Sequence, residues 1–329
     1  MKAVRLQRTG GPDVLELVDL PRPEPGPGQA RVRARSIGIG RPDALIRTGR
    51  YKWMPPLPAI PGNEMAGVVD AVGPGVTEVA VGQHVLLSSR ELPERGGCYA
   101  EYACAPAAAL YPLPQSIAFD DAVSLPNFQL AQALLFHCGT GRPPKSVLLT
   151  GAAGGVASTL VRLARSQGMQ VIATASTQAK RDFARANGAD AALDPAADVL
   201  AERVMALTDG RGVDLAVDSI GGELFMKCLR ALAPLGTAVS YNIVGGMPGD
   251  VFGELRALLG RSIGVRCFSM HTFDADPGLR RQLMSDAIQA MASGRLQAPP
   301  ATVLPLAAAR EAHQRLDAPD TLGKLILHP

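Results

Sequence analysis

The sequence predicts an α/β protein that combines a β-rich domain with a doubly wound parallel-sheet domain. Its 329 residues are enough for two domains of ordinary size, each with its own core. Short alternating runs separated by Pro/Gly clusters fill residues 1 to about 115, whereas strand and helix patterns alternate from Lys145 onward. Repeated strand–helix units on a short pitch are typical of a parallel sheet with helices on both faces.

The N-terminal part is predicted to form a compact β-barrel or sandwich. Alternating runs predict strands at 2–7, 14–20, 29–39, 65–73, 83–89 and 99–106. Clusters such as "PRPEPGPGQ" separate these strands, because Pro and Gly favour turns. The pattern changes near Ile117, and residues 120–139 are expected to form a helix with Asp120 or Asp121 as its N-cap.

The second part alternates between strand and helix patterns. Strands are expected at 146–150, 170–175, 190–193, 213–218, 236–241 and 263–268. Helices are expected at 154–166, 178–186, 200–207, 223–232 and 252–260. The C-terminal tail is mixed, with helices expected at 277–293 and 306–316 and a last strand at 323–328.

Composition excludes several classes of protein. Lys+Arg 33 against Asp+Glu 30 leaves a net charge of +3, and only 4% of residues are aromatic, so no nucleic-acid surface is expected. The N-terminus lacks the apolar core of a signal peptide, and no run of apolar residues is long enough to span a membrane. The five dispersed cysteines are expected to be reduced thiols. We therefore expect a cytoplasmic protein without nucleic-acid or membrane partners.

A glycine-rich turn follows the strand at 146–150. Gly151 permits a sharp exit from the strand, and Gly154 and Gly155 let backbone N–H groups approach a pyrophosphate at a helix N-terminus. Ala157 takes the place of the last glycine of the usual fingerprint, where alanine still permits close helix–strand packing. The cofactor-binding residues expected in this turn are Gly151, Ala153, Gly154, Gly155 and Val156. The alternative is an ordinary loop with structural glycines.

The end of the next strand indicates which dinucleotide binds. NAD sites usually carry an acid here that accepts from the ribose 2′-OH. The stretch "ATASTQAKR" contains no acid before Asp182. It offers instead Ser176, Thr177, Lys180 and Arg181, whose hydroxyls and cations suit a 2′-phosphate, so NADPH is favoured. The alternative is that both cations belong to a solvated first turn of helix.

The whole chain resembles the medium-chain dehydrogenases/reductases, in particular their zinc-independent quinone oxidoreductase branch. The resemblance rests on the order and spacing of "IRTGRY", "PGNEMAGVVDAVGPGV", "GCYAEYACAP", "GAAGGVA", "GVDLAVDSIGG", "ALAPLGTAVS" and "LGKLIL". It implies a GroES-like catalytic domain from residues 1–118 and 268–329 and a Rossmann NADPH-binding domain from 119–267. It also implies a homodimer.

No metal is expected. Zinc members of the family carry Gly-His-Glu where this chain has Gly62-Asn63-Glu64, and a cysteine within the segment that here spans 40–43. Catalytic zinc needs about three converging protein ligands. The remaining chemistry is hydride delivery from NADPH to an acceptor that is already electrophilic: a quinone, an activated enone or an enoyl thioester.

The resemblance also suggests catalytic residues and further cofactor contacts. Tyr51 matches a tyrosine near the substrate and is expected to bind or protonate it, the alternative being a tyrosine that packs on the barrel. Asp43 matches an acid near the nicotinamide end of the cofactor, the alternative being a turn cap. Strand ends on the carboxyl edge of the sheet add the expected cofactor contacts Ser219, Asn242, Ile243 and Phe268.

Three departures from the family pattern bear on these sites: Gly40, Ala131-Gln132, and the "LDP" at 193–195 where relatives often have an adenine-stacking tyrosine. The sequence leaves two alternatives to a quinone reductase. One is an enoyl thioester reductase, and the other is a non-catalytic NADPH-binding sensor or structural protein.

Overall fold

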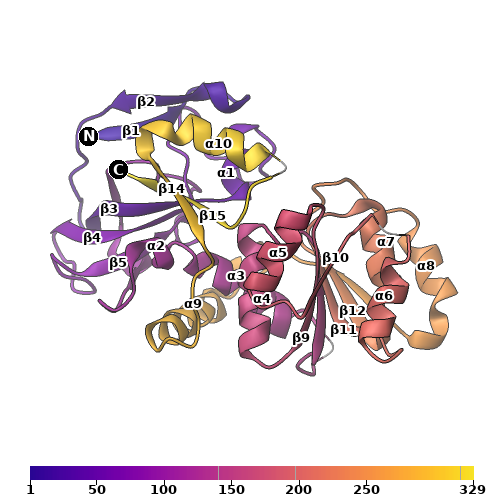
Figure 1. Ribbon diagram of the computed structural model, residues 1–329. Helices are drawn as coiled ribbons and strands as arrows, with labels where there is room; N and C mark the ends of the chain where they lie inside the picture. The colour runs from indigo at the N-terminus through magenta and orange to yellow at the C-terminus, as the bar shows by residue number, and fades with distance from the viewer. Residues whose placement is uncertain (140, 197, 319) are drawn as a thin grey trace. The chain divides into compact units, whose positions relative to one another are not determined.

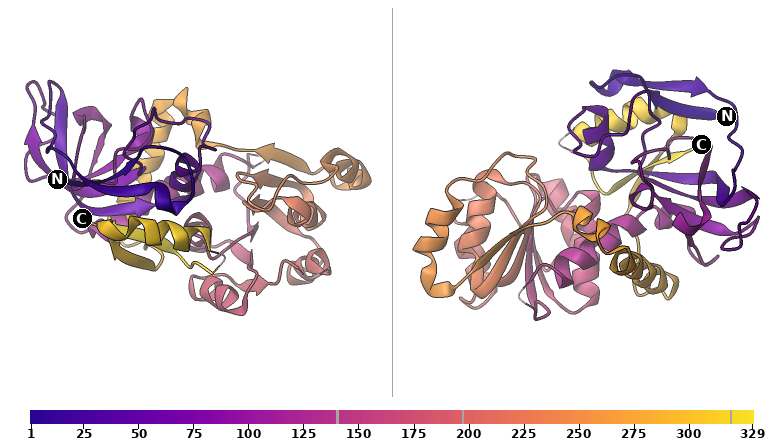
Figure 2. Two further views of the ribbon diagram at one scale, coloured as in Figure 1. Left: turned by 90° about the horizontal axis from the view of Figure 1, so that it is seen from above. Right: turned by 180° about the vertical axis from the view of Figure 1, so that it is seen from behind.

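The computed structural model describes residues 1–139, 141–196, 198–318 and 320–329, which divide into two compact units (Figure 1). Unit 1 comprises Met1–Pro126, Ile288–Gly294 and Pro300–Pro329, and unit 2 comprises Asn127–Ala287 and Arg295–Pro299. Both termini belong to unit 1, because the chain returns there for its last elements (Figure 2). The resemblance predicts that residues 119–267 fold as one inserted domain, and these bounds stay a prediction.

Unit 1 is built on a mixed sheet whose order among the described strands is β14-β15-β3-β4-β5-β7, with β6 also paired to β3. The strands are β3 (Gln29–Ile39), β4 (Glu64–Val72), β5 (His84–Ser88), β6 (Tyr102–Pro106), β7 (Leu110–Pro112), β14 (Ala301–Pro305) and β15 (Lys324–His328). A separate antiparallel pair joins β1 (Lys2–Leu6) to β2 (Leu15–Asp19). The C-terminal strand β15 lies antiparallel to β3, so residues far apart in sequence become neighbours.

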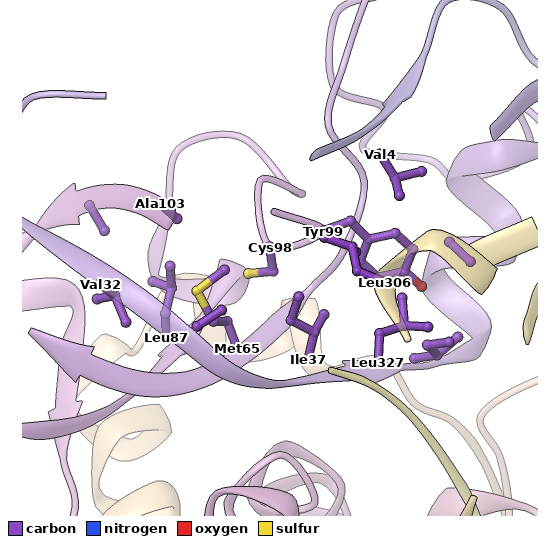
Figure 3. Packing of buried hydrophobic residues seen from close by; sticks show 14 of the residues in the cluster. Val4, Val32, Ile37, Met65, Leu87, Cys98, Tyr99, Ala103, Leu306 and Leu327 are labelled. Carbon is purple, nitrogen blue, oxygen red and sulfur yellow. The ribbon is translucent and has the colours of Figure 1, made fainter. Parts of the chain in front are cut away.

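Hydrophobic residues at alternate strand positions form the core of unit 1. Val32, Ile37, Met65 and Leu87 point from β3, β4 and β5 into one cluster, as Figure 3 shows. Leu327 from the C-terminal strand belongs to the same cluster. The strand pattern thereby fixes which side chains of unit 1 are buried.

Two expectations about the helices that follow β3 and precede β8 (Ser146–Leu149) are corrected. A short helix, α1 (Arg41–Arg47), follows β3 where the strand pattern gave no element. The single helix expected over 120–139 is wrong, because α2 (Phe119–Ala122) and α3 (Leu125–Phe136) are separate. Neither Asp120 nor Asp121 is the N-cap of α2, which is Ala118. The Asp120 carboxylate instead accepts from the Ser36 hydroxyl and contacts His328 Nε2 at 2.7 Å.

The predicted doubly wound parallel sheet of unit 2 is confirmed, with strand order β10-β9-β8-β11-β12-β13. Its strands are β8 (Ser146–Leu149), β9 (Gln170–Thr174), β10 (Ala191–Leu193), β11 (Val213–Asp218), β12 (Leu232–Ser240) and β13 (Gly264–Cys267). The helices are α4 (Gly155–Ser166), α5 (Gln178–Ala186), α6 (Leu200–Leu207), α7 (Gly222–Arg230) and α8 (Val251–Ala257). Figure 1 shows α4 and α5 on one face of the sheet and α6, α7 and α8 on the other. The order reverses between β8 and β11, where ligands bind in such sheets.

The remaining elements lie in the C-terminal part. Helix α9 (Pro277–Ala292) matches its expected position, while the helix expected at 306–316 begins as a short 3₁₀ turn before α10 (Ala309–Asp317). Strands β7 and β14 were not predicted, and both end in proline, which removes a ladder donor and weakens the strand pattern. No helix in the described part of the chain is long and apolar enough to cross a membrane.

Candidate functional site

The glycine turn lies at the reversal of strand order in unit 2. Gly151 follows β8 with φ +61°, a left-handed conformation that favours glycine. A Cβ at this position would lie 3.1 Å from Ile220 Cδ1 and 3.3 Å from Ser219 Oγ, so the turn passes close to the segment after β11. The Ala152 amide donates to the Thr174 carbonyl at 3.0 Å, which ties the turn to the end of β9.

Helix α4 begins directly after this turn. Gly154 is its N-cap, with extended backbone and an exposed surface, and Gly155 and Val156 are the first two helical residues. The first amides of a helix have no partner within it, and the helix dipole favours an anion there. Ala157 is 3% exposed, in keeping with the close packing expected at this position. Ala153 is buried beneath the turn.

A buried carboxylate fixes the loop after β11. Asp218 accepts from the Thr150 hydroxyl at 2.6 Å and from the Gly221 amide at 2.7 Å. Burial raises the pKa of Asp218, and these hydrogen bonds oppose the rise. The Thr150 hydroxyl also accepts from the Ser219 amide at 3.1 Å. Thr150 and Asp218 therefore join the carboxyl ends of β8 and β11 and position Ser219 beside the glycine turn.

The loops after β11 and β12 are paired with each other. The Gly245 amide donates to the Ile220 carbonyl at 2.7 Å, and the Val244 amide donates to the Ser219 carbonyl at 3.4 Å. Asn242 Oδ1 accepts from the Ile243 amide at 2.9 Å, and the Ile243 side chain is exposed. The structure thus brings Ser219, Asn242 and Ile243 together at the carboxyl edge of the sheet.

Phe268 lies one strand further along the same edge. Its amide donates to the Ser240 carbonyl at 2.9 Å, which places it just beyond β13. Its ring packs against Phe273 with centroids 5.9 Å apart.

Gln132, in the segment where family members tend to show Thr-Ala, donates from its side-chain amide to the Leu283 carbonyl at 3.0 Å.

The hydroxyls and cations after β9 do not all have the same role. Thr177 is the N-cap of α5 and accepts from the Lys180 amide at 3.3 Å, while Ser176 is exposed. Arg181 Nη1 donates to the Ala175 carbonyl at 3.0 Å and to Asp194 Oδ2 at 3.3 Å. Arg181 is therefore ion-paired, a contact the sequence analysis did not anticipate. Asp194 follows β10, and its only sequence signal was the "LDP" departure.

Unit 1 contains a buried polar chain around Asp43. Asp43 is fully buried, and its carboxylate accepts from the Gly40 amide at 2.7 Å and from Asn63 Nδ2 at 2.6 Å. Asn63 Oδ1 accepts in turn from the Ser89 hydroxyl at 2.6 Å. The hydrogen bond from the Gly40 amide to the Asp43 carboxylate caps the start of α1, as the turn-cap alternative proposed. Burial raises the pKa of Asp43 to about 7, and the nearby Glu64 adds to the rise.

Two further buried groups border this chain. Lys324 from β15 is ion-paired with Glu64 at the start of β4, and both side chains are almost completely buried. Tyr99 packs beneath Gly62 and shares a hydrogen bond of 3.0 Å with His313 Nε2. Burial lowers the pKa of His313 to about 4, and the Arg47 charge adds to the effect. Sequence reasoning missed Ser89, Lys324 and His313, since no local spacing links them to Asp43.

Tyr51 lies at the edge of the unit 1 core. It is half-buried, packs against the core, and its ring centroid is 5.7 Å from that of Trp53. Burial raises the pKa of Tyr51, whereas the charges of Arg90 and Arg95 and a hydrogen bond with Arg95 oppose the rise. The phenol therefore lies close to two guanidinium groups.

Comparison with known proteins identifies the family. A family model for the alcohol dehydrogenase GroES-like domain matches residues 26–115, and one for zinc-binding dehydrogenases matches residues 155–286. Quinone oxidoreductase from Pseudomonas aeruginosa is 33% identical over 332 residues, covering 100% of this chain and 99% of that protein. The chain belongs to the zinc-independent quinone oxidoreductase branch of the medium-chain dehydrogenases/reductases. The GroES-like and Rossmann folds implied by the resemblance are thereby confirmed.

Two further relatives of this quinone oxidoreductase-like chain bear on its chemistry. A 2-haloacrylate reductase from a Burkholderia species is 32% identical over 281 residues, covering 83% of this chain and 81% of that protein. The structure of Escherichia coli quinone oxidoreductase complexed with NADPH superposes with a TM-score of 0.87 at 27% identity, covering 100% of both chains.

The residues at the turn fit a dinucleotide. The left-handed Gly151, the exposed Gly154 and the first amides of α4 leave backbone donors accessible to a pyrophosphate. A residue with a Cβ at Gly151 would press on Ser219 and narrow this approach.

The position of the family's zinc site holds a different arrangement. Asn63, which replaces the histidine of zinc members, bridges Asp43 and Ser89. In the described part of the chain, no group of three or more His, Cys, Asp or Glu side chains is placed to hold a metal ion. The expectation that the protein works without a metal stays a prediction.

Proposed function

We propose that this chain is an NADPH-dependent oxidoreductase that reduces quinones and activated alkenes. The observation that carries the proposal is the left-handed Gly151 turn at the reversal of strand order, in a chain that matches quinone oxidoreductases over its full length. The Burkholderia relative is named for reducing a haloacrylate, whose double bond is activated by a carboxylate, and this supports activated alkenes as acceptors.

The geometry of unit 2 supports the proposed cofactor contacts. When bound, NADPH supplies a hydride from its nicotinamide ring. The amides of Gly155 and Val156 would hold the pyrophosphate, with Gly151, Ala153 and Gly154 shaping the turn: the Gly154 amide donates to the Gly151 carbonyl at 3.1 Å. The residues that would hold the 2′-phosphate are Ser176, Thr177, Lys180 and Arg181. The paired loops and the end of β13 supply the residues that would contact the nicotinamide half: Ser219, Asn242, Ile243 and Phe268.

Tyr51 and Asp43 have different roles in this proposal. The Tyr51 phenol, held among guanidinium groups, donates a hydrogen bond to the acceptor's carbonyl oxygen, which draws electron density from the carbon that receives hydride. Asp43 is fully buried, so it acts as a positioning residue that orients the Asn63 amide and caps α1. Tyr51→Phe is expected to lower kcat by about tenfold or more while leaving NADPH affinity unchanged.

Partners and location follow from surface features. The substrates are small molecules, and no nucleic acid is expected. We propose a homodimer that pairs along β13, the outermost strand at one end of the described sheet of unit 2, beside the exposed Phe252 and Leu259. Sedimentation as a monomer would contradict this. The five cysteines are free thiols, which supports a reducing, cytoplasmic location.

The test is NADPH consumption by the purified protein with four reaction mixtures: a para-quinone, an enone, an enoyl thioester, and no acceptor. We expect turnover with the quinone or enone and a preference for NADPH over NADH. Turnover with the enoyl thioester alone would favour the thioester reductase alternative. NADPH binding without turnover of any acceptor would favour the sensor or structural alternative.

A further inference from the structure

Asp194 is ion-paired with Arg181, one of the residues proposed to bind the 2′-phosphate. Arg181 Nη1 lies 3.3 Å from Asp194 Oδ2 and 3.0 Å from the Ala175 carbonyl, and Nη2 lies 3.2 Å from Gln178 Oε1. The Arg181 side chain is 16% exposed and that of Asp194 43% exposed. The guanidinium is thus held in one place before any ligand arrives.

The two residues meet at the edge where the adenosine ribose binds in such folds. Ala175 directly follows β9 and Asp194 directly follows β10, and these strands are adjacent and parallel. The Ala175 amide donates to the Leu193 carbonyl at 3.1 Å, which joins the two strand ends. In dinucleotide folds this edge carries either an acid for the 2′-OH of NADH or an arginine for the 2′-phosphate of NADPH. Here Arg181 comes after β9, which no acid follows before Asp182, and Asp194 at the end of the adjacent β10 supplies the carboxylate.

We propose that Asp194 sets the cofactor selectivity of this chain by competing with the 2′-phosphate for Arg181. This inference rests on the proposed function. A phosphate that approaches Arg181 meets the Asp194 carboxylate, which is already paired with that arginine. The two negative charges repel each other at such short distances. The same carboxylate can accept from the 2′-OH of NADH. Asp194 therefore weakens NADPH binding, favours NADH, and keeps the preference for NADPH modest.

The carboxylate can be neutralised with little change of shape. Asp194 Oδ1 accepts from the Ala196 amide at 2.9 Å, and an asparagine oxygen accepts there equally well. Asp194→Asn thus removes the charge while preserving the local turn. A matched control is Glu254→Gln. Glu254 on α8 is paired with Arg230 on α7 at 2.9 Å, beside the other half of the sheet, so this variant neutralises a carboxylate away from Arg181.

The experiment measures binding by calorimetry, with NADPH, NADH, adenosine 2′,5′-bisphosphate and adenosine 5′-monophosphate as probes. Asp194→Asn is expected to tighten NADPH and the bisphosphate by about fivefold and to leave the monophosphate within about twofold. Arg181→Gln is expected to weaken the bisphosphate and spare the monophosphate. Glu254→Gln should change none of the four, and thermal melts confirm that each variant is folded.

Two results would overturn the inference while leaving the proposed function intact. If wild type binds NADPH and Asp194→Asn binds the bisphosphate unchanged, the carboxylate does not compete. If Asp194→Asn binds it more weakly, Asp194 instead holds Arg181 in its binding position. Failure of wild type to bind either NADPH or the bisphosphate would remove the proposed function itself.

Discussion

Asp43 lies in the first turn of α1 and is fully buried, and Asp43→Asn removes its charge while keeping its shape. The surrounding hydrogen bonds accommodate this change. An asparagine oxygen accepts from the Gly40 amide as Asp43 does. Its amide nitrogen then faces Asn63, whose side chain can turn over because the Ser89 hydroxyl either donates or accepts. The variant should therefore fold with its polar chain complete.

The size of the expected change in stability with pH follows from the pKa of Asp43. Burial raises the pKa of Asp43 from its ordinary 3.8 to about 7, so the folded state binds this proton more tightly than the unfolded state. The resulting stability is fully present below about pH 4 and is lost as the pH rises through about 7. Between pH 5 and pH 8 the loss amounts to about 2.5 kcal/mol in the free energy of unfolding.

Urea denaturation of wild type and Asp43→Asn at several pH values measures this loss. His313 titrates with the opposite sign in the same range, because its folded pKa is lowered to about 4. Both proteins carry His313, so subtracting their unfolding free energies isolates Asp43. The difference should shift by about 2.5 kcal/mol in favour of the variant from pH 5 to pH 8. A difference that does not change with pH would refute a buried, proton-binding Asp43.

Three further predictions concern single positions. Gly62→Ala should lower the free energy of unfolding by about 2 to 4 kcal/mol. Gly62 has φ +99°, and the added Cβ would lie 2.7 Å from the Tyr99 nitrogen. An unchanged urea midpoint would contradict this prediction. His313→Gln should flatten the loss of stability as the pH falls from 6.5 toward about 4, since the wild-type imidazole stays neutral over that range, and melting curves at each pH would show it. Gly151→Val should raise the Kd for NADPH by about tenfold or more, because Gly151 has φ +61° and the added carbons would press on Ser219. An unchanged Kd in a fluorescence titration would argue against the turn as the binding site.

Local periodicity was sufficient to predict most of unit 2. Helix α5, helix α6 and strand β11 have the bounds expected from the sequence, because their apolar spacing matches the element that forms. The glycine turn was also located correctly, since strand, turn and helix follow one another directly. In contrast, α1 is only seven residues long and was missed, although Pro42 and Asp43 after Gly40 are typical helix-start residues.

The contacts that build the candidate site are mostly long-range, and spacing along the chain does not reveal them. Lys324 meets Glu64 across 260 residues, and Asn63 meets Asp43 across 20. Asp194 reaches Arg181 only because β9 and β10 are adjacent in the sheet. Asp120 was expected to cap a helix, but its carboxylate is engaged by Ser36 and His328, which only the folded sheet brings near.

Anaerobic mixing of stoichiometric NADPH with the protein and a para-quinone allows the loss of NADPH and the formation of quinol to be followed together. The account predicts one quinol formed per NADPH consumed with wild type, and strongly reduced conversion with folded Gly151→Val at the same NADPH concentration. Unconsumed NADPH with quinone and enone alike, in a protein shown to be folded, would contradict the claim that this chain is an NADPH-dependent reductase of such acceptors.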